Sequence, residues 1–167
     1  MGAQQNKDYI FLVDDEPIQN EMLKDFLAEK FNFAIKTYDS GEGALKDIKL
    51  NPEIIVLDYH LNSHLPDAQD GIEVLKMLKA QLPETKIIML SGQDKIEVAI
   101  ESMKYGAFDY VIKGETAFSR MENIINYIGE ISSMRAANRT YKQVIAGLCI
   151  AFALIVIASV SLVLKMR

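Results

Sequence analysis

Acidic residues follow two apolar runs that lie far apart in the chain. Tyr9–Val13 runs into Asp14 and Asp15, and Ile54–Leu57 runs into Asp58. Short runs rich in β-branched and aromatic residues are typical of strands buried on both faces of a parallel sheet. Open sheets of this kind place their ligand crevices at the carboxyl ends of the strands. We therefore expect the three carboxylates to lie close together at one edge of one sheet.

Two further apolar runs end in residues that can bind an anion. Ile87–Leu90 is followed by Ser91, and Tyr110–Ile112 is followed by Lys113. Carboxylates at close quarters require a cation such as Mg²⁺, which prefers oxygen ligands. A carboxylate beside such a cation, with an ammonium and a hydroxyl opposite, is what the capture of a phosphoryl group by an aspartate requires. The pattern thus predicts a Mg²⁺-dependent site that accepts a phosphoryl group.

The segment after the first acids predicts an amphipathic helix. Pro17 suits the first turn of a helix, because its missing N–H has no partner there in any case. Apolar residues then recur at helical spacing up to about Lys30, namely Ile18, Met22, Leu23, Phe26 and Leu27. We expect these side chains to form the inward face of the helix.

The remaining segments complete an alternating pattern. A strand of mixed character is expected at a sheet edge over residues 33–38, and helices over about 40–50, 71–83, 95–105 and from 116 onward. Five strands that alternate with five helices predict an α/β fold with a (βα)5 doubly wound parallel sheet and right-handed crossovers.

Five motifs together resemble the receiver domain of two-component response regulators. They are Val13-Asp14-Asp15-Glu16, Asp58, Asp70-Gly71, Ser91-Gly92 and the run from Gly106 to Lys113. The resemblance covers residues 8–131 and implies a flavodoxin-like receiver that takes a phosphoryl group from a histidine kinase or a phosphotransfer protein. With no output domain expected after it, the chain looks like a single receiver of the chemotaxis type.

The resemblance implies a metal site and a phosphoacceptor. Asp58 matches the residue that accepts the phosphoryl group. Asp15, Asp58 and the main-chain carbonyl of His60 match the ligands of Mg²⁺, and Asp14 matches a residue that acts on the ion through water.

The resemblance also implies a switch. Ser91 and Lys113 match the hydroxyl and the ammonium that bind the phosphoryl group, and Tyr110 matches the aromatic side chain that follows the movement of Ser91. His60 and Gln93 occupy the two positions that tune how long the phosphoryl group lasts in receivers.

The sequence departs from the receiver pattern at two places. Gly71 lies 13 positions after Asp58, so that the connection over residues 59–70 is about five residues longer than usual for receivers. The lysine is usually followed by a cis proline, whereas Lys113 is followed by Gly114. Because a cis peptide bond before a residue other than proline costs about 2.5–4 kcal/mol, we expect either a trans bond with a shifted loop or a strained cis bond.

The C-terminal segment has the composition of a membrane-spanning helix. Residues 144–164 contain no charged residue, and about 20 apolar residues suffice to cross a hydrocarbon core of about 30 Å. We predict a transmembrane helix there, after a helical juxtamembrane linker over residues 132–143 and before a short tail over residues 165–167. Residues 1–7 are expected to form a flexible N-terminus.

Basic residues indicate the orientation of this span. Arg135, Arg139 and Lys142 precede it, whereas Lys165 and Arg167 follow it, which slightly favours a cytoplasmic N-terminal side. Phosphodonors and free magnesium are cytoplasmic as well. We therefore expect a single-pass protein of the inner (cytoplasmic) membrane whose receiver domain faces the cytoplasm.

The expected partners follow from these features. The span would contact the lipid bilayer, and the small residues Gly147, Ala151 and Ala158 would let two spans pack as a homodimer. With 23 acidic and 18 basic residues, the net charge of -5 gives no case for nucleic acid as a partner. Because no segment after residue 131 suits an output domain, we expect a downstream protein near the membrane.

Three functions remain open at this stage. The leading one is a signalling receiver, not an enzyme acting on other molecules, whose face around the fourth helix, the fifth strand and the fifth helix switches on phosphorylation. The second is a receiver-like membrane scaffold that is never phosphorylated. The third is a Mg²⁺-dependent phosphohydrolase that works through an aspartyl phosphate, which requires an Asp-x-Asp spacing that Asp14-Asp15-Glu16-Pro17 lacks.

Overall fold

A computed structural model describes the backbone of residues 8–61, 70–92 and 95–165, with side chains except at 136, 139–140, 153–163 and 165. The described strands are β1 (Tyr9–Val13), β2 (Ala34–Tyr38), β3 (Ile54–Asp58), β4 (Lys86–Ser91) and β5 (Asp109–Ile112). The helices are α1 (Pro17–Lys30), α2 (Gly41–Lys46), the short 3₁₀ helix η1 (Ile48–Leu50), α3 (Gly71–Gln81), α4 (Ile96–Lys104) and α5 (Ala117–Lys165). The chain divides into two compact units, residues 1–125 and residues 126–167.

The strands of the first unit form one parallel sheet in the order β2-β1-β3-β4-β5. The mixed strand β2 lies at the edge of this sheet, as its sequence predicts. Val13 of β1 pairs with Leu57 of β3, and Asp58 pairs with Leu90 of β4. The carboxyl ends of β1, β3 and β4 therefore meet at one edge, where Asp14 and Asp15 follow β1 and Asp58 ends β3.

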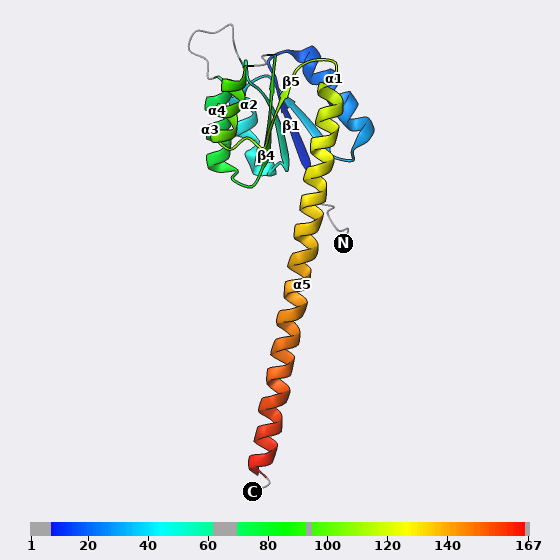
Figure 1. Cartoon of the computed structure of the whole chain (residues 1–167), viewed down its shortest axis with the longest axis vertical. Coiled ribbons are helices and arrows are strands. Elements are labelled where there is room, and N and C mark those ends of the chain that lie inside the picture. Colours follow the sequence, from blue (N-terminus) through cyan, green and yellow to red (C-terminus); the bar gives the residue numbers. More distant parts are fainter. Residues whose placement is uncertain (1–7, 62–69, 93–94, 166–167) are drawn as a thin grey trace. The chain divides into compact units, whose positions relative to one another are not determined.

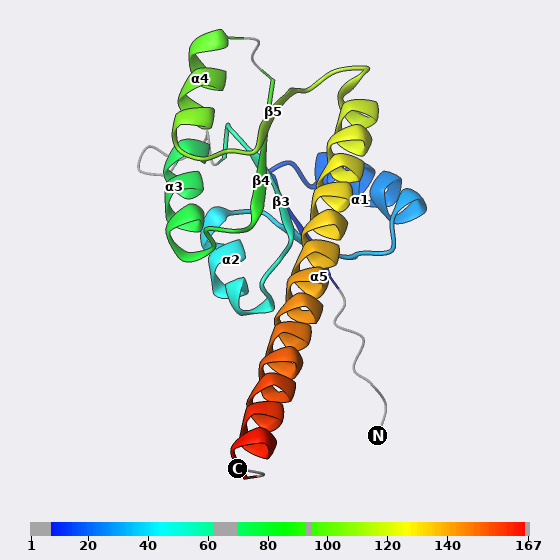
Figure 2. The ribbon, with the colours of Figure 1, turned by 60° about the horizontal axis from the view of Figure 1, so that its bottom comes forward.

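Helices cover both faces of the sheet (Figures 1 and 2). On one face the side chains of Phe11, Ile55 and Ile87 pack into one buried cluster with apolar residues of α2, α3 and α4. The alternate residues of the strands, among them Leu12 and Val56, are buried on the other face, where α1 and the first turns of α5 lie. The predicted doubly wound fold is confirmed, and near-continuous apolar strands are what a sheet covered on both faces needs.

Local signals at the helix ends also agree with the sequence. Ser40 caps α2, because its Oγ accepts a hydrogen bond of 3.3 Å from the N–H of Gly43. The carboxylate of Asp70 caps α3 in the same way. Gly106 follows α4 with a φ of 94°, a left-handed conformation that a residue without a Cβ adopts at little cost.

The predicted inward face of α1 is wrong in part. Leu23 and Leu27 are buried as expected, but Ile18 is 75% exposed and Met22 is exposed as well. The third buried residue of the helix is Asn20, three and seven positions before the two leucines. The face of α1 that meets the sheet is thus rotated away from the apolar residues of its first turns, because the amide of Asn20 finds hydrogen-bond partners there.

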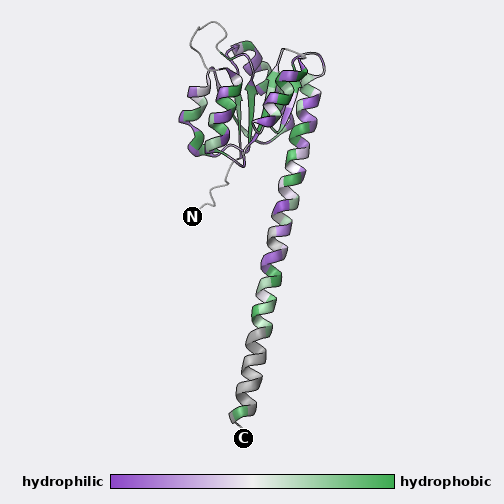
Figure 3. Cartoon of the chain, turned by 60° about the vertical axis from the view of Figure 1, so that its left-hand side comes forward, coloured by the Kyte–Doolittle hydropathy of each residue, from purple (hydrophilic) through white to green (hydrophobic). Residues whose placement is uncertain are grey.

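Helix α5 runs without a break from Ala117 to Lys165, as the lack of a stop signal in the sequence predicts. Figure 3 shows hydrophilic turns followed by hydrophobic turns along its described part. In the part of the chain that the structure describes, no helix is long and apolar enough to cross a membrane. Residues 153–163, half of the predicted span over 144–164, lie outside the described side chains. The span is therefore not supported by the structure and stays a prediction from the sequence.

Candidate functional site

Three carboxylates meet at the carboxyl edge of the sheet. Asp14 and Asp15 follow β1, Asp58 ends β3, and one carboxylate oxygen of each lies within 4.8 Å of the others. Asp14 and Asp58 are buried, whereas Asp15 is half-buried. The predicted convergence of the three acids is confirmed.

The ammonium of Lys113 lies among these acids. The backbone N–H of Lys113 donates to the carbonyl of Ser91 over 2.7 Å, which extends the pairing of β5 with β4 and directs the side chain to the same edge. Its Nζ donates a hydrogen bond of 2.9 Å to Oδ2 of Asp14 and lies 3.1 Å from Oδ1 of Asp58. Burial by itself would lower the pKa of Lys113, but the hydrogen bond to Asp14 and the charges of Asp58 and Asp14 outweigh it and raise the pKa.

Carboxylates outnumber ammonium groups in the described part of the site. Three carboxylates lie close together there, and the ammonium of Lys113 contacts two of them. Asp58 is only 2% exposed, and its buried Oδ1 lies 3.1 Å from the ammonium of Lys113. A buried carboxylate beside two further carboxylates fits a divalent ion with a preference for oxygen ligands, such as Mg²⁺.

Burial raises the pKa of Asp58, and the neighbouring charge of Asp14 adds to this rise while Lys113 opposes it. A carboxyl group whose pKa is higher in the folded state than in the unfolded chain stabilises the fold in its protonated form. This stabilisation is lost as the pH rises through the folded pKa. Without a divalent cation, ionised Asp58 therefore destabilises the protein at neutral pH.

Asp58→Asn is accordingly expected to be more stable than the wild type in EDTA at pH 7. Lys113 keeps its hydrogen bond to Asp14, and the amide removes one repelling charge. A gain of about 1 kcal/mol raises the Tm of a domain of this size by roughly 4 °C. The difference should shrink as the pH falls through the raised folded pKa of Asp58 and be lost below about 4, the usual pKa of an unfolded aspartate. Calorimetric scans at several pH values measure it. Asp109→Asn is the control. Asp109 begins β5 at the opposite edge of the sheet and pairs with Arg120, so that this variant should not have a higher Tm than the wild type. A lower Tm for Asp58→Asn at pH 7 would contradict the expected repulsion among the carboxylates.

Two of the predicted switch residues, Ser91 and Tyr110, are buried, Ser91 next to the acidic site and Tyr110 in the core. Ser91 is fully buried at the end of β4, one residue beyond Leu90, the partner of Asp58 in the sheet. The ring of Tyr110 is buried in the core cluster with Val98 of α4. Their roles stay predictions, but the positions of both side chains agree with them.

Only part of the predicted lifetime-tuning pair is described. His60 is half-buried next to the site, with its ring against that of Tyr59, and its charge acts to lower the pKa of Asp58. Gln93 lies outside the described residues, as do residues 62–69 of the long connection. The role of the His60 carbonyl as a metal ligand stays a prediction.

Gly71, the first residue of α3, lies close to the backbone of Asp58, the predicted phosphoacceptor, and of Tyr59. The N–H of Gly71 donates to the carbonyl of Tyr59 over 3.0 Å. A Cβ at Gly71 would lie 2.5 Å from the carbonyl oxygen of Asp58 and 2.7 Å from Cα of Tyr59. Glycine is thus required here by a close backbone approach.

The peptide bond between Lys113 and Gly114 is trans, since the described residues contain no cis peptide bond. Of the two alternatives left open by the sequence, the trans bond is therefore the correct one. A Cβ at Gly114 would meet nothing within 4 Å.

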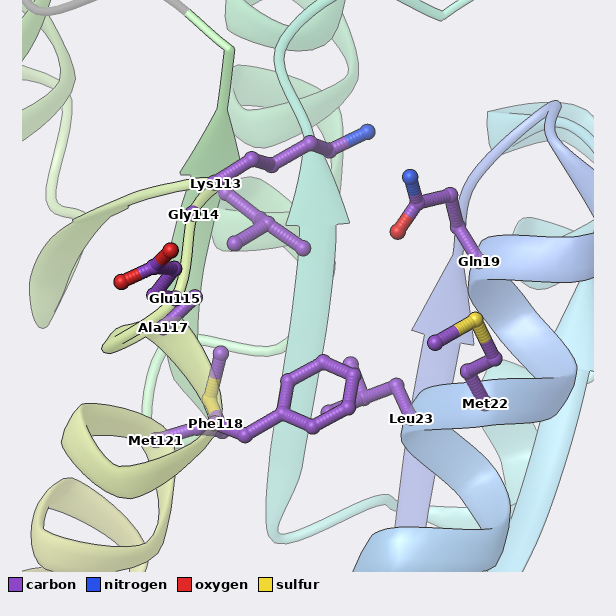
Figure 4. A pocket seen from close by; sticks show the side chains of 10 residues that line it. Gln19, Met22, Leu23, Lys113, Gly114, Glu115, Ala117, Phe118 and Met121 are labelled. Carbon is purple, nitrogen blue, oxygen red and sulfur yellow. The ribbon is translucent and has the colours of Figure 1, made fainter.

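A cavity of about 350 Å³ opens beside Lys113, between α1 and the first turns of α5 (Figure 4). Its wall away from the site is apolar and consists mainly of Leu23, Phe118 and Met121. The amide of Gln19 and the ammonium of Lys113 lie at its other end, toward the acids. The cavity was not expected from the sequence, because it depends on how far α1 stands from α5.

Sequence reasoning also missed Asn20. Its Nδ2 donates hydrogen bonds to the carbonyl oxygen of Asp14 over 2.7 Å and to that of Tyr38 over 3.0 Å. The signal was present, because the spacing of Leu23 and Leu27 assigns position 20 to the same helix face. A polar residue on the buried face of a helix requires such partners.

The fold and the site together define a class of protein, a doubly wound α/β domain with an acidic site at the carboxyl edge of its sheet. Residues 10–126 match the family model of the response regulator receiver domain. Since this match covers more than half of the 167 residues, the chain belongs to the response regulator receiver domain family.

Curated relatives agree with this assignment. The nitrogen assimilation regulatory protein NtrX of Azorhizobium caulinodans is 32% identical over 135 residues, which are 80% of this chain and 29% of NtrX. The transcriptional regulatory protein FixJ of Bradyrhizobium diazoefficiens is 30% identical over 108 residues, 64% of this chain and 50% of FixJ. This chain thus spans half or less of these two relatives. The curated relatives include NtrX, an NtrX-like response regulator and a transcriptional regulator. The prediction that the chain is a receiver of the chemotaxis type is therefore not supported.

Solved structures show the same fold. The receiver domain of NtrX from Brucella abortus has a TM-score of 0.64 at 28% identity, and covers 72% of this chain and 98% of its own. The BeF3-activated receiver domain of DrrB has a TM-score of 0.64 at 27% identity, and covers 74% of this chain and 98% of its own.

Proposed function

We propose that this protein is a membrane-anchored receiver that accepts a phosphoryl group on Asp58. The observation that carries the proposal is the contact of the Lys113 ammonium with two of three clustered carboxylates, at 2.9 Å and 3.1 Å. The ammonium already lies where negative charge has to be neutralised when a phosphoryl group arrives. The protein signals through this modification and does not act as an enzyme on other molecules.

Each side chain has a role in the transfer. A carboxylate oxygen of Asp58 forms the bond to phosphorus while the bond from phosphorus to the donor's imidazole nitrogen breaks, and the imidazole keeps the electron pair and takes a proton. Lys113 exchanges its contact with Asp58 for one with a phosphoryl oxygen, and the hydroxyl of Ser91 donates to another. Asp15, Asp58 and the His60 carbonyl would hold Mg²⁺, with Asp14 acting through water. When bound, Mg²⁺ would supply positive charge that offsets the negative charge of the phosphoryl oxygens.

The phosphodonor is a histidine kinase or a phosphotransfer protein. Ile18 and Met22 are exposed on α1, and Met22 also lines the cavity that reaches Lys113. Exposed apolar side chains next to a site are typical of a protein-binding surface. They support a donor that docks on α1 and presents its phosphohistidine to Asp58.

A second exposed apolar surface supports a downstream partner. Ile96, Ile100 and Met103 recur at helical spacing on α4 and are exposed, as is Ile112 at the end of β5. Tyr110, whose ring would move with Ser91 in the proposed switch, is buried in the core cluster with Val98 of α4, the helix that carries most of this surface. Phosphorylation of Asp58 would move Ser91 and Tyr110 and thereby change this surface for a downstream protein at the membrane.

The proposed membrane anchor rests on the sequence of residues 144–164 and on the exposed apolar side chains in this part of α5. No charge occurs between residues 144 and 164. The described apolar side chains of this stretch are exposed on several sides of the helix, namely Val144, Ile145, Leu148, Ile150, Phe152 and Leu164. A helix that is apolar all round has to be covered by lipid or protein. We propose the inner membrane as the cover, with the receiver in the cytoplasm and Gly147, Ala151 and Ala158 as a contact between two spans.

Beryllofluoride and Mg²⁺ test the switch, because beryllofluoride activates the related DrrB receiver domain. In amide NMR spectra of the full chain in detergent, the two additions together should shift the signals around Ser91 and Tyr110. Asp58→Asn should show no such shift. An unresponsive but folded wild type would favour the rival function, an anchored scaffold that is never phosphorylated.

Flotation with liposomes tests the anchor. The full chain should float with the lipid and stay bound at high salt, whereas a chain carrying charged residues at Leu148 and Phe152 should not. Sedimentation of the wild type away from the lipid would rule out the membrane and leave a protein partner as the cover of this helix.

A further inference from the structure

One buried polar side chain beside the acids has no role in the proposed transfer. Asn20 lies on the inner face of α1 and is only 7% exposed. Its two recorded partners, the main-chain oxygens of Asp14 and Tyr38, are both acceptors. The amide nitrogen must therefore face them, because the amide oxygen would be repelled.

The two carbonyl groups belong to the ends of neighbouring strands. Tyr38 ends β2, and its carbonyl oxygen also accepts the N–H of Asp14 over 3.1 Å. The position of Tyr38 is itself fixed, because its hydroxyl donates to Asp47 over 2.9 Å and its ring packs against Phe11. Asn20 thus joins the turn after β1 to a rigid point at the end of β2.

The carbonyl of Asp14 is part of the peptide group that continues into Asp15. Because a peptide group is planar, fixing this oxygen also fixes the N–H of Asp15 and the plane from which its side chain departs. The other side of the turn is held by Oδ1 of Asp14, which accepts the N–H of Glu16 over 2.8 Å. With both bonds in place, the turn has little freedom to rotate the carboxylates of Asp14 and Asp15 away from Asp58.

We propose that Asn20 is a positioning residue for the acidic site. Its amide holds the carbonyl of Asp14 and so aims the carboxylates of Asp14 and Asp15 at the place where a divalent cation binds next to Asp58. This inference rests on the proposed function, since it assigns a residue to the binding of Mg²⁺ at the same site. Such partners behind the metal ligands typically contribute about 10- to 100-fold to metal affinity.

Asn20→Leu tests this inference, because leucine has a similar shape and no donor. The matched control is Thr85→Val. Thr85 is also buried, and its hydroxyl donates over 2.7 Å to the carbonyl of Pro52, before β3 and thus at the opposite edge of the sheet. Asn20→Leu loses two hydrogen bonds to main-chain carbonyls and Thr85→Val loses one, and both variants should lose stability. Only the bonds of Asn20 lie beside the acids.

The full chain is labelled by acetyl phosphate at increasing Mg²⁺ concentrations, and the concentration that gives half-maximal labelling is measured. Calorimetry gives the Mg²⁺ affinity of each variant, and thermal scans give its Tm. Asn20→Leu should raise the half-maximal Mg²⁺ concentration about tenfold or more, while the rate at saturating Mg²⁺ stays near that of the wild type. Thr85→Val should lower the Tm and leave the Mg²⁺ requirement unchanged.

One result would contradict the role of Asn20, and another would contradict the proposed function on which that role rests. If Asn20→Leu needs no more Mg²⁺ than Thr85→Val at a similar loss of Tm, Asn20 is a structural residue and the inference is wrong. If the wild type neither binds Mg²⁺ nor is labelled, the proposed function fails, and the role of Asn20 fails with it. Should Asn20→Leu not fold, Asn20→Ser takes its place, because a serine hydroxyl is too short to bridge both carbonyls.

Discussion

Lys113→Met is expected to slow phosphorylation of the protein by at least about 100-fold, the loss typical of removing one group that stabilises transition-state charge. The same change should tighten the binding of Mg²⁺. In the free protein the ammonium lies 2.9 Å from Asp14 and 3.1 Å from Asp58 and so competes with a divalent ion for both carboxylates. Removing it should raise the Mg²⁺ affinity at least tenfold, or about 1.4 kcal/mol. Labelling by acetyl phosphate gives the rate, and calorimetry gives the affinity.

The opposite signs of these two effects make the prediction specific. A variant that is merely unfolded would lose both activities. Lys30→Met serves as a control, because Lys30 at the end of α1 forms an ion pair of 3.6 Å with Glu122, away from the acids, and its loss should leave rate and affinity unchanged. Weaker Mg²⁺ binding by folded Lys113→Met would show that the ammonium does not compete with the metal.

Among variants that add one methyl group near the site, Gly71→Ala is expected to lower the free energy of unfolding the most. The added Cβ would lie 2.5 Å from the carbonyl oxygen of Asp58, and this neighbour is backbone that cannot rotate aside. Forcing a methyl group into packed structure typically costs about 1–3 kcal/mol. The collision also pushes on the residue that carries the phosphoryl group. Labelling should therefore slow down even at temperatures where the circular dichroism spectrum shows a folded chain.

Gly114→Ala is the matched control for this prediction. It adds the same methyl group at the same edge of the sheet, where a Cβ meets nothing within 4 Å. Its unfolding free energy and its labelling rate should stay close to those of the wild type. Equal behaviour of the two alanine variants would mean that α3 does not constrain the backbone of Asp58.

The sheet and the acidic site could be predicted from the sequence because both depend on short-range patterns. Runs such as Ile54–Leu57 are apolar on both faces, and each ends in the residue that the site needs. Parallel strands then bring these residues together, whatever the details of the helices. Asp14, Asp58 and Lys113 meet as predicted for this reason.

What could not be predicted depends on distances between elements. Leu23 and Leu27 place position 20 on their own helix face, whereas Ile18 and Met22 define a second apolar face. The packing of α1 on the sheet selects the first of these faces. The cavity beside Lys113 has the same origin, because no local pattern encodes the spacing of two helices. At about 3.6 residues per turn, Ile18 and Met22 lie on the opposite side of the helix from Asn20, and the apolar pattern alone does not choose between the two sides.

Intact mass spectrometry of the full chain with Mg²⁺ and acetyl phosphate tests the central claim most directly. The account predicts that the wild type gains one phosphoryl group, that hydroxylamine removes it as it does an acyl phosphate, and that Asp58→Asn gains none. A folded wild type that stays unmodified, or an Asp58→Asn variant that is labelled as fast as the wild type, would contradict it.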